Sequence, residues 1–185
     1  DMTRGVQHLD EVMELMLDSF EQCMDKGPLA KEPMVGVKVK LSDASLHEDA
    51  IHRGPAQIYP AVREPIYACL LKAKPIILEP IQKVWVDVPQ DYMGGVTREL
   101  QRRRGVVGDM TQKDEVMTIE GKIPVAESFG FAGDMRSASE GHALWSTENS
   151  GFDKLPTDMQ QPIILQIRDR KGLKKEVPQA SDFTQ

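Results

Sequence analysis

The segment IQKVWVDVPQDYMGGVTRELQRRRG, residues 81–105, decides the fold class of the second half of the chain. Apolar residues recur on one side of the stretch from Ile81 to Val88, which predicts a strand with one buried face. The apolar positions then follow helical spacing, which predicts a helix from about Gln90 to Arg103. Gly105 follows this helix in the manner of a C-cap residue. The buried face of the helix is expected to consist of Met93, Val96 and Leu100.

The residues that follow complete an order of six elements. Two strands are expected over 105–112 and 115–125, joined by a hairpin turn at Lys113 and Asp114. The stretch ESFGFAGDMRSASEG, 127–141, predicts a second helix, and a last strand is expected near 142–148. Strand, helix, strand, strand, helix, strand is the split-βαβ, ferredoxin-like pattern. The sequence therefore predicts an α+β protein with a ferredoxin-like domain over residues 77–158.

Residues 1–76 are expected to form a domain of their own. An amphipathic helix is predicted over 6–26, ending at Gly27 and Pro28. The alternating stretch MVGVKVKL, 34–41, predicts a half-buried strand. The polar connection SDASLHEDAIHRG runs for 13 residues without a hydrophobic period, and connections of this length are often functional.

A second helix is expected to follow this connection and to reach about Lys74. Pro60 is placed in its first turn, where a missing N–H is harmless, and Pro65 is expected to distort it. A short amphipathic helix is predicted over 159–171, and an extended tail over the last residues to 185. The inner face of the second helix is expected to consist of Tyr59, Val62, Ile66, Leu70 and Ala73.

The composition is that of a globular protein, with 40% hydrophobic and 28% charged residues. No apolar run approaches the roughly 20 residues that cross a membrane, and no signal-peptide pattern opens the chain. Because the chain begins at Asp1, it is expected to be a fragment or a processed piece. Cys23 and Cys69 are expected to be two small buried side chains, a usage that fits a reducing, cytoplasmic compartment.

The charge distribution changes sign inside the polar connection. The net charge of −6 argues against an autonomous nucleic-acid binder. Residues 1–49 carry five Lys and Arg against eleven Asp and Glu, whereas residues 50–76 carry four against one. The change occurs at His52, which is where an anionic partner is expected.

Two histidines in this connection raise the question of a metal or catalytic site. His47 and His52 are five residues apart, so on a helix their side chains would point about 140° apart. The HExxH spacing of zinc proteases is four, and nothing here favours a metal held by His47, Asp49 and His52. No GxSxG nucleophile is present. A general-base histidine and an ordinary exposed loop residue both remain open for His52.

Several stretches resemble one family. LHEDAIHRGPAQ resembles the loop of the elongation factor 2 family in which one histidine is converted to diphthamide. LLKAKPIILEPI, VPQDYMGGVTRELQRRRG and IPVAESFGFAGDMRSASEG resemble the family's last domain, and IRDRKGLKKEVP resembles its C-terminus. GPA after His52, in place of GGG, favours the archaeal branch. The resemblance implies a partial domain IV, a helix-strand-loop-helix piece of a ribosomal-protein-like βαβ fold, followed by domain V.

The resemblance implies a role for His52 at the tip of domain IV, where it meets the tRNA–mRNA duplex in the decoding region. His52 is the implied diphthamide site, and Arg53 is expected to add a phosphate contact. Diphthamide-synthesis enzymes, ADP-ribosylating toxins and the ribosome are the implied partners. The chain is expected to act as a monomer in the cytoplasm.

The GTPase part of the family is not present in this sequence. Its phosphate loop, GxxxxGK[ST], has no counterpart in the 185 residues, so we expect no GTP binding and no catalysis by this chain. GTP and Mg²⁺ are expected in an N-terminal domain outside it. A second basic patch has two open interpretations, helix capping or contact with ribosomal RNA, and consists of Arg98, Arg102, Arg103 and Arg104.

The competing interpretation is a free-standing ferredoxin-like RNA-binding or regulatory module. An RNA-recognition sheet presents aromatic side chains on its middle strands. The strands GVVGDMTQ and EVMTIEGKIPV contain none, which disfavours this alternative.

Overall fold

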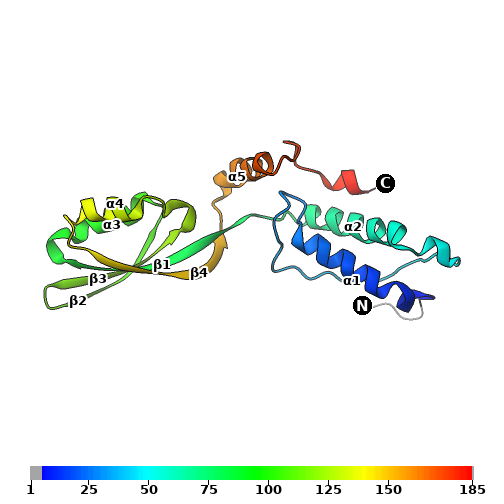
Figure 1. Cartoon of the computed structure of the whole chain (residues 1–185), viewed down its shortest axis with the longest axis horizontal. Helices are drawn as coiled ribbons and strands as arrows, with labels where there is room; N and C mark the ends of the chain where they lie inside the picture. The colour runs from blue at the N-terminus through cyan, green and yellow to red at the C-terminus, as the bar shows by residue number, and fades with distance from the viewer. Residues whose placement is uncertain (1–5, 185) are drawn as a thin grey trace. The chain divides into compact units, whose positions relative to one another are not determined.

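The computed structural model describes residues 6–184 and divides into two units (Figure 1). Unit 2 is Ile77–Pro156. Unit 1 comprises the chain up to Ile76 together with the residues from Thr157 onward. The C-terminal segment, taken from the sequence as a separate part, therefore packs with the N-terminal helices.

Unit 2 confirms the predicted α+β class. Its four strands form one antiparallel sheet in the order β2-β3-β1-β4, with the crossovers that the ferredoxin-like pattern requires. The short 3₁₀ turns η2 (Gln90–Tyr92) and η3 (Val125–Glu127) precede the two helices. The main elements are β1 Leu78–Pro89, α3 Met93–Arg102, β2 Val106–Lys113, β3 Val116–Pro124, α4 Phe131–Ala138 and β4 Leu144–Lys154.

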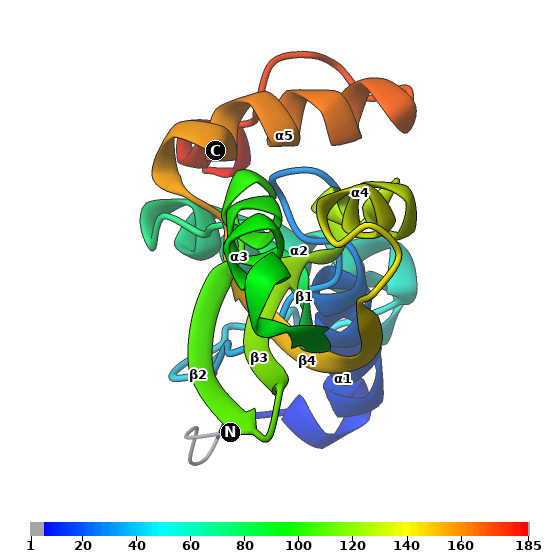
Figure 2. The same cartoon turned by 90° about the vertical axis from the view of Figure 1, so that its left-hand side faces the viewer.

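Both helices of unit 2 cover the same face of its sheet (Figure 2). Alternate residues of β1 point toward them, so Val84, Val86 and Val88 are almost fully buried. The core between helices and sheet is completed by Val96, Leu100, Ile119, Ile123, Phe131, Met135 and Ala143. Trp145 packs against it from β4, with its ring edge-on to Phe131.

The end of α3 differs from the expected glycine cap by one residue. Arg104, with φ +55°, takes the left-handed position, and its N–H bonds to the carbonyl of Gln101. Gly105 donates its N–H to the carbonyl oxygen of Leu100 at 2.9 Å. A Cβ at Gly105 would lie 2.5 Å from that oxygen, so lack of space, not a positive φ, requires glycine here.

Unit 1 is helical over its described residues. Helix α1 (Leu9–Asp25) packs against α2 (Pro55–Lys72), with Val12 and Cys23 of α1 buried at their contact. Helix α5 (Thr157–Arg170) lies beside the turn after α1, because Arg168 and Lys171 donate hydrogen bonds to backbone carbonyls of residues 29–31. The tail is not wholly extended. It forms the 3₁₀ turn η4 (Ala180–Phe183), and Phe183 packs edge-on against Tyr67.

Three expectations for unit 1 are wrong. Residues 34–41 form no strand, because no other described segment of the unit provides a strand with which they could pair. Val35 and Val39, which were expected on the buried face of that strand, are exposed. Helix α2 begins at Pro55, so Pro60 lies beyond its first turn, and the helix continues through both internal prolines. Cys69 is exposed, whereas Cys23 is buried as expected.

The inner face of α2 is shifted relative to the prediction. Ile66 and Leu70 are buried as expected. Ala73 is exposed, and Tyr59 and Val62 are half-buried. Ile58, Tyr67 and Ala68 are the buried residues that the predicted face left out.

No described helix is both long and apolar enough to span a bilayer.

The glycine at the end of α3 gives a test of this packing. Gly105→Ala is expected to lower the free energy of unfolding of unit 2 by about 1–3 kcal/mol, because the added methyl group meets backbone. Gly94→Ala is the matched control, since a Cβ there meets nothing within 4 Å and alanine favours the helix. Both tryptophans lie in unit 2, so fluorescence during urea unfolding reports on it. Equal stability of the two variants would contradict the close approach.

Candidate functional site

The tip loop, defined as residues 47–54, begins with a turn that its own aspartate organises. The Asp49 side chain accepts the N–H of Ile51 at 3.1 Å, which starts the 3₁₀ turn η1 (Ala50–His52). The N–H groups of His52 and Arg53 bond back to the carbonyls of Asp49 and Ala50. Helix α2 starts immediately afterwards. The loop therefore has a defined backbone even though most of its side chains are exposed.

His47 and His52 come together in this loop, contrary to the divergence expected on a helix. Their ring centroids are 4.5 Å apart, with the planes at 63°. The N–H of Asp49 bonds to Nδ1 of His47 at 3.0 Å. The backbone is a loop and a tight turn, so helical spacing does not apply. Across residues 6–184, no three His, Cys, Asp or Glu side chains gather closely enough to hold a metal ion.

Arg53 points into the protein and not toward a partner. Its side chain is 7% exposed, although the residues before it are exposed. Nη1 donates to the carbonyls of His47 at 2.7 Å and Glu48 at 2.6 Å, and Nη2 donates to Oε2 of Glu11 at 2.5 Å. In this conformation both terminal nitrogens of Arg53 are used within the chain. The predicted phosphate contact of Arg53 is therefore not available in it.

Glu11 links the tip loop to the first turn of α1. Its second carboxylate oxygen lies 2.6 Å from Nδ1 of His8. The hydrogen bonds from His8 and then from Arg53 lower the pKa of Glu11 below its ordinary value. No sequence motif singled out Glu11, because its partner Arg53 is 42 residues away.

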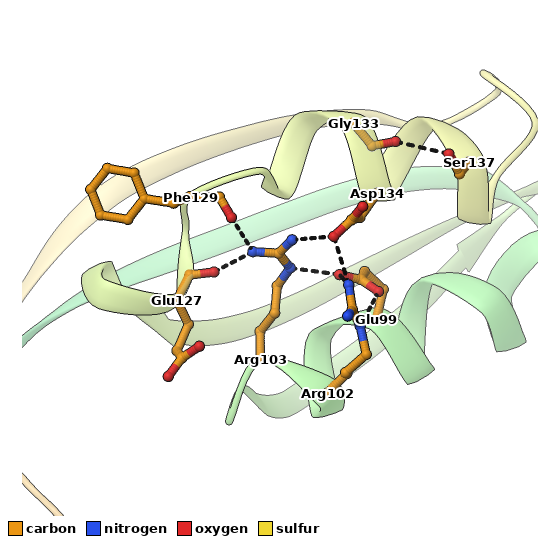
Figure 3. A network of polar contacts seen from close by, with 8 residues as sticks. All are labelled: Glu99, Arg102, Arg103, Glu127, Phe129, Gly133, Asp134 and Ser137. Atoms are coloured by element: carbon orange, nitrogen blue, oxygen red, sulfur yellow. Dashed lines mark hydrogen bonds and ion pairs between the residues drawn. The ribbon is translucent and has the colours of Figure 1, made fainter.

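The second predicted patch is not a uniform basic surface, because the guanidinium of Arg103 is buried at the centre of a polar network (Figure 3). Its side chain is 8% exposed. Nε bonds to Glu99 at 2.5 Å and Nη2 bonds to Asp134 at 2.5 Å. Nη1 donates to the carbonyls of Glu127 and Phe129. One guanidinium thus ties α3 to α4 and to the loop between β3 and α4.

The other three arginines of the patch differ in exposure. Arg104 is 26% exposed and pairs with Glu79 and Glu127. The side chain of Arg102 is 61% exposed while bonding to Glu99 and Asp134. Arg98 is exposed. Only Arg98 and Arg102 therefore present substantial surface to a partner, and Arg103 and Arg104 bind carboxylates of neighbouring elements.

The carboxylates of this network have altered acidity. Burial acts against ionisation of Glu99, but the hydrogen bonds from Arg102 and Arg103 outweigh it, so its pKa is lowered. The hydrogen bond from Arg103 lowers the pKa of Asp134 as well. Both carboxylates provide the counter-charge that a buried guanidinium needs.

Two aromatic side chains of unit 2, Trp85 and Phe129, were not among the candidate site residues predicted from the sequence. Trp85 lies on the central strand β1, whereas the two segments without aromatic residues, GVVGDMTQ and EVMTIEGKIPV, form the edge strand β2 and the central strand β3. Lys83 lies over its ring, with Nζ 4.7 Å from the centroid. Phe129 is 82% exposed on the loop that Arg103 holds, and its ring points away from the network (Figure 3). The sequence feature that could have indicated an exposed loop position for Phe129 is the glycine that follows it, Gly130, which has a φ of +75°.

The Arg103 network predicts a dependence of stability on acid pH. Because the pKa values of Glu99 and Asp134 are lowered by folding, their contribution is present above the ordinary carboxyl pKa. It is lost as pH falls through the lowered values. Glu99→Gln is expected to cost unit 2 about 1–3 kcal/mol at pH 7 and to flatten its loss of stability below about pH 4.5.

Urea unfolding between pH 7 and pH 3, followed by tryptophan fluorescence, checks this expectation. Glu115→Gln at the exposed hairpin turn is the matched control and should behave as the wild type. A Glu99→Gln variant with the wild-type pH profile would show that the network adds no stability.

The chain is similar to known translation factors over its whole length. Residues 1–74 match the family model of elongation factor G domain IV, and residues 76–163 match that of the elongation factor G C-terminus. Elongation factor 2 of Methanosarcina barkeri is 59% identical over 183 residues, which are 99% of this chain and 25% of that protein. Elongation factor 2 of Methanopyrus kandleri is 53% identical over 183 residues, 99% of this chain and 15% of that protein.

The chain thus spans a quarter or less of the length of these two relatives. The two matches follow each other along the chain and meet at residues 74–76, next to the division between the two units at Ile76 and Ile77. The chain therefore belongs to the elongation factor G and elongation factor 2 family, as a piece that contains domain IV and C-terminal sequence.

Proposed function

We propose that this chain is the tip-bearing part of a GTP-dependent ribosomal translocation factor. In this proposal the tip loop contacts the tRNA–mRNA duplex in the decoding region during polypeptide elongation. GTP and Mg²⁺ bind to another part of the full-length protein, so the chain transmits motion and performs no chemistry itself.

The observation that carries the proposal is the way His52 is presented. His52 is exposed, and no described residue forms a hydrogen bond to its ring. Its one aromatic contact within residues 6–184 is the T-shaped contact with His47. An imidazole held on an ordered loop with its nitrogens free is accessible to a modifying enzyme. Family membership makes diphthamide-synthesis enzymes the proposed partners for that step, and ADP-ribosylating toxins the proposed partners of the modified residue.

A modified His52 would suit a contact that does not depend on sequence. Diphthamide adds a quaternary ammonium group, which is a fixed positive charge on a flexible branch. Charge contacts to phosphate and sugar position a protein on nucleic acid without reading bases. A factor that serves every codon requires this kind of contact.

The exposed arginines of unit 2 support a second proposed contact, with ribosomal RNA. Arg98 and Arg102 present their guanidinium groups on the outer side of α3. Arg103 and Arg104, which the sequence grouped with them, instead hold the fold. We therefore restrict the RNA contact in this patch to Arg98 and Arg102.

The proposal predicts a selective effect of His52→Ala in the full-length protein. Folding and ribosome-stimulated GTP turnover are expected to stay near wild type, because the side chain is exposed and supports no core contact. Single-round translocation is expected to slow by about three- to tenfold, since charge-assisted contacts at the tip are lost.

Rapid-mixing translocation assays and a frameshifting reporter measure this effect. Asp43→Ala, on the same connection but outside the tip loop, is the control. Unchanged translocation and frame maintenance in His52→Ala, against a modified wild type, would reject the proposed role of the loop.

A further inference from the structure

We propose that Glu11 and Arg53 form a clamp, defined as these two side chains and their mutual hydrogen bond, that positions the tip loop. Both are then positioning residues and neither contacts RNA. The proposal rests on the proposed function of His52 and assigns a role to a residue on α1 that no tip motif contains.

The first argument is geometric. Arg53 closes the tip loop on itself, because its Nη1 binds the carbonyls of His47 and Glu48 at 2.7 and 2.6 Å. The same guanidinium reaches α1 through the 2.5 Å bond to Glu11. Two nitrogens of one planar fork here hold three acceptors on two segments, and a lysine ammonium, a single point donor, does not reproduce their spacing.

The second argument concerns the two imidazoles. His52 directly precedes Arg53, and His47 carries one of the two carbonyls that Arg53 binds. The clamp therefore fixes the backbone at both ends of the segment from His47 to His52. The edge-to-face contact at 4.5 Å follows from this closure, and with it the direction in which His52 leaves the loop.

The third argument is electrostatic. The Arg53 side chain is 7% exposed, and Glu11 is the carboxylate that bonds to it. The Glu11 side chain is 53% exposed, so water screens the pair in part. Without Glu11 the guanidinium nevertheless keeps only the two carbonyls as acceptors and is expected to turn outward to water. The bond to His8 holds the other carboxylate oxygen and keeps Glu11 aimed at the loop.

The competing account makes Arg53 a direct phosphate ligand, and the two accounts give opposite results for Glu11. If Arg53 contacts RNA, removal of Glu11 frees the guanidinium and leaves translocation unchanged or faster. If Arg53 acts as a clamp, removal of Glu11 has the same effect as changing Arg53 itself.

The test uses four variants of the full-length protein: Glu11→Ala, Glu11→Gln, Arg53→Lys and the control Asp10→Ala. Asp10 lies in the same first turn of α1 and equally favours the helix N-terminus. Hydrogen exchange, measured by mass spectrometry on peptides covering 46–55, reports on the loop. Glu11→Ala and Arg53→Lys should exchange about tenfold faster there, Glu11→Gln less so, and Asp10→Ala as wild type.

The second measurement is single-round translocation with GTP turnover. Glu11→Ala and Arg53→Lys are expected to slow translocation to the same degree as His52→Ala. A fifth variant that combines Glu11→Ala with Arg53→Lys is expected to slow it no further. Unchanged exchange in both variants would overturn the clamp. Faster exchange with wild-type translocation, while His52→Ala is slow, would overturn its role in positioning.

A different measurement would reveal a failure of the proposed function itself, namely wild-type translocation by the His52→Ala variant. The exchange measurement on the Glu11 and Arg53 variants reports the clamp in that case too, because it does not depend on any ribosomal partner.

Discussion

A buried guanidinium is stabilised by acceptors for its N–H donors, and this need accounts for how three irregular segments of the chain are held, although Nε of Arg53 is buried without a partner among the described residues. Among the arginines of residues 6–184, three are nearly buried, Arg53, Arg103 and Arg168, at 9%, 7% and 7% exposure. Each donates to backbone carbonyls of a segment that is neither helix nor sheet. Such carbonyls lack partners in secondary structure, and an arginine fork can satisfy two or three of them together. The tip loop, the loop before α4 and the C-terminal tail are ordered by the same device.

The three arginines differ in whether a carboxylate is among their hydrogen-bond partners. Arg53 bonds to Glu11 on α1, and Arg103 bonds to Asp134 on α4 as well as to Glu99 on α3, the helix that directly precedes it. Each therefore fixes a loop relative to a regular element. The hydrogen bonds of Arg168 go to three carbonyls, those of Leu29, Lys174 and Glu176. Arg168 thus joins the tail to the turn after α1. A charge-assisted hydrogen bond is stronger than one to a carbonyl, which suits a loop that, in the proposed function, presents His52 in one direction.

Most regular elements could be predicted from the sequence, but the contacts that hold these loops could not. Alternation along β1 and helical spacing along α3 identify a strand and a helix, because local burial patterns reflect one buried face. Arg53 and Arg103 looked like surface cations, since most arginines are, and their partners Glu11 and Asp134 are 42 and 31 residues away. Residues 34–41 show the converse limit. Their alternation is that of a strand, but a strand also needs a neighbour that the described part of unit 1 does not provide.

Net charge and local order together bear on how the tip would meet RNA. The chain carries −6 overall, so its average field repels a polyanion and gives little long-range attraction. A contact with phosphate must then come from a few well-placed groups. Placing them on a loop that is already ordered avoids the entropy cost of ordering it on binding. The bonds of Arg53 to His47, Glu48 and Glu11 provide that order. If the tip loop contacts RNA as proposed, the cation buried beneath it leaves His52 as the group that is free to reach the partner.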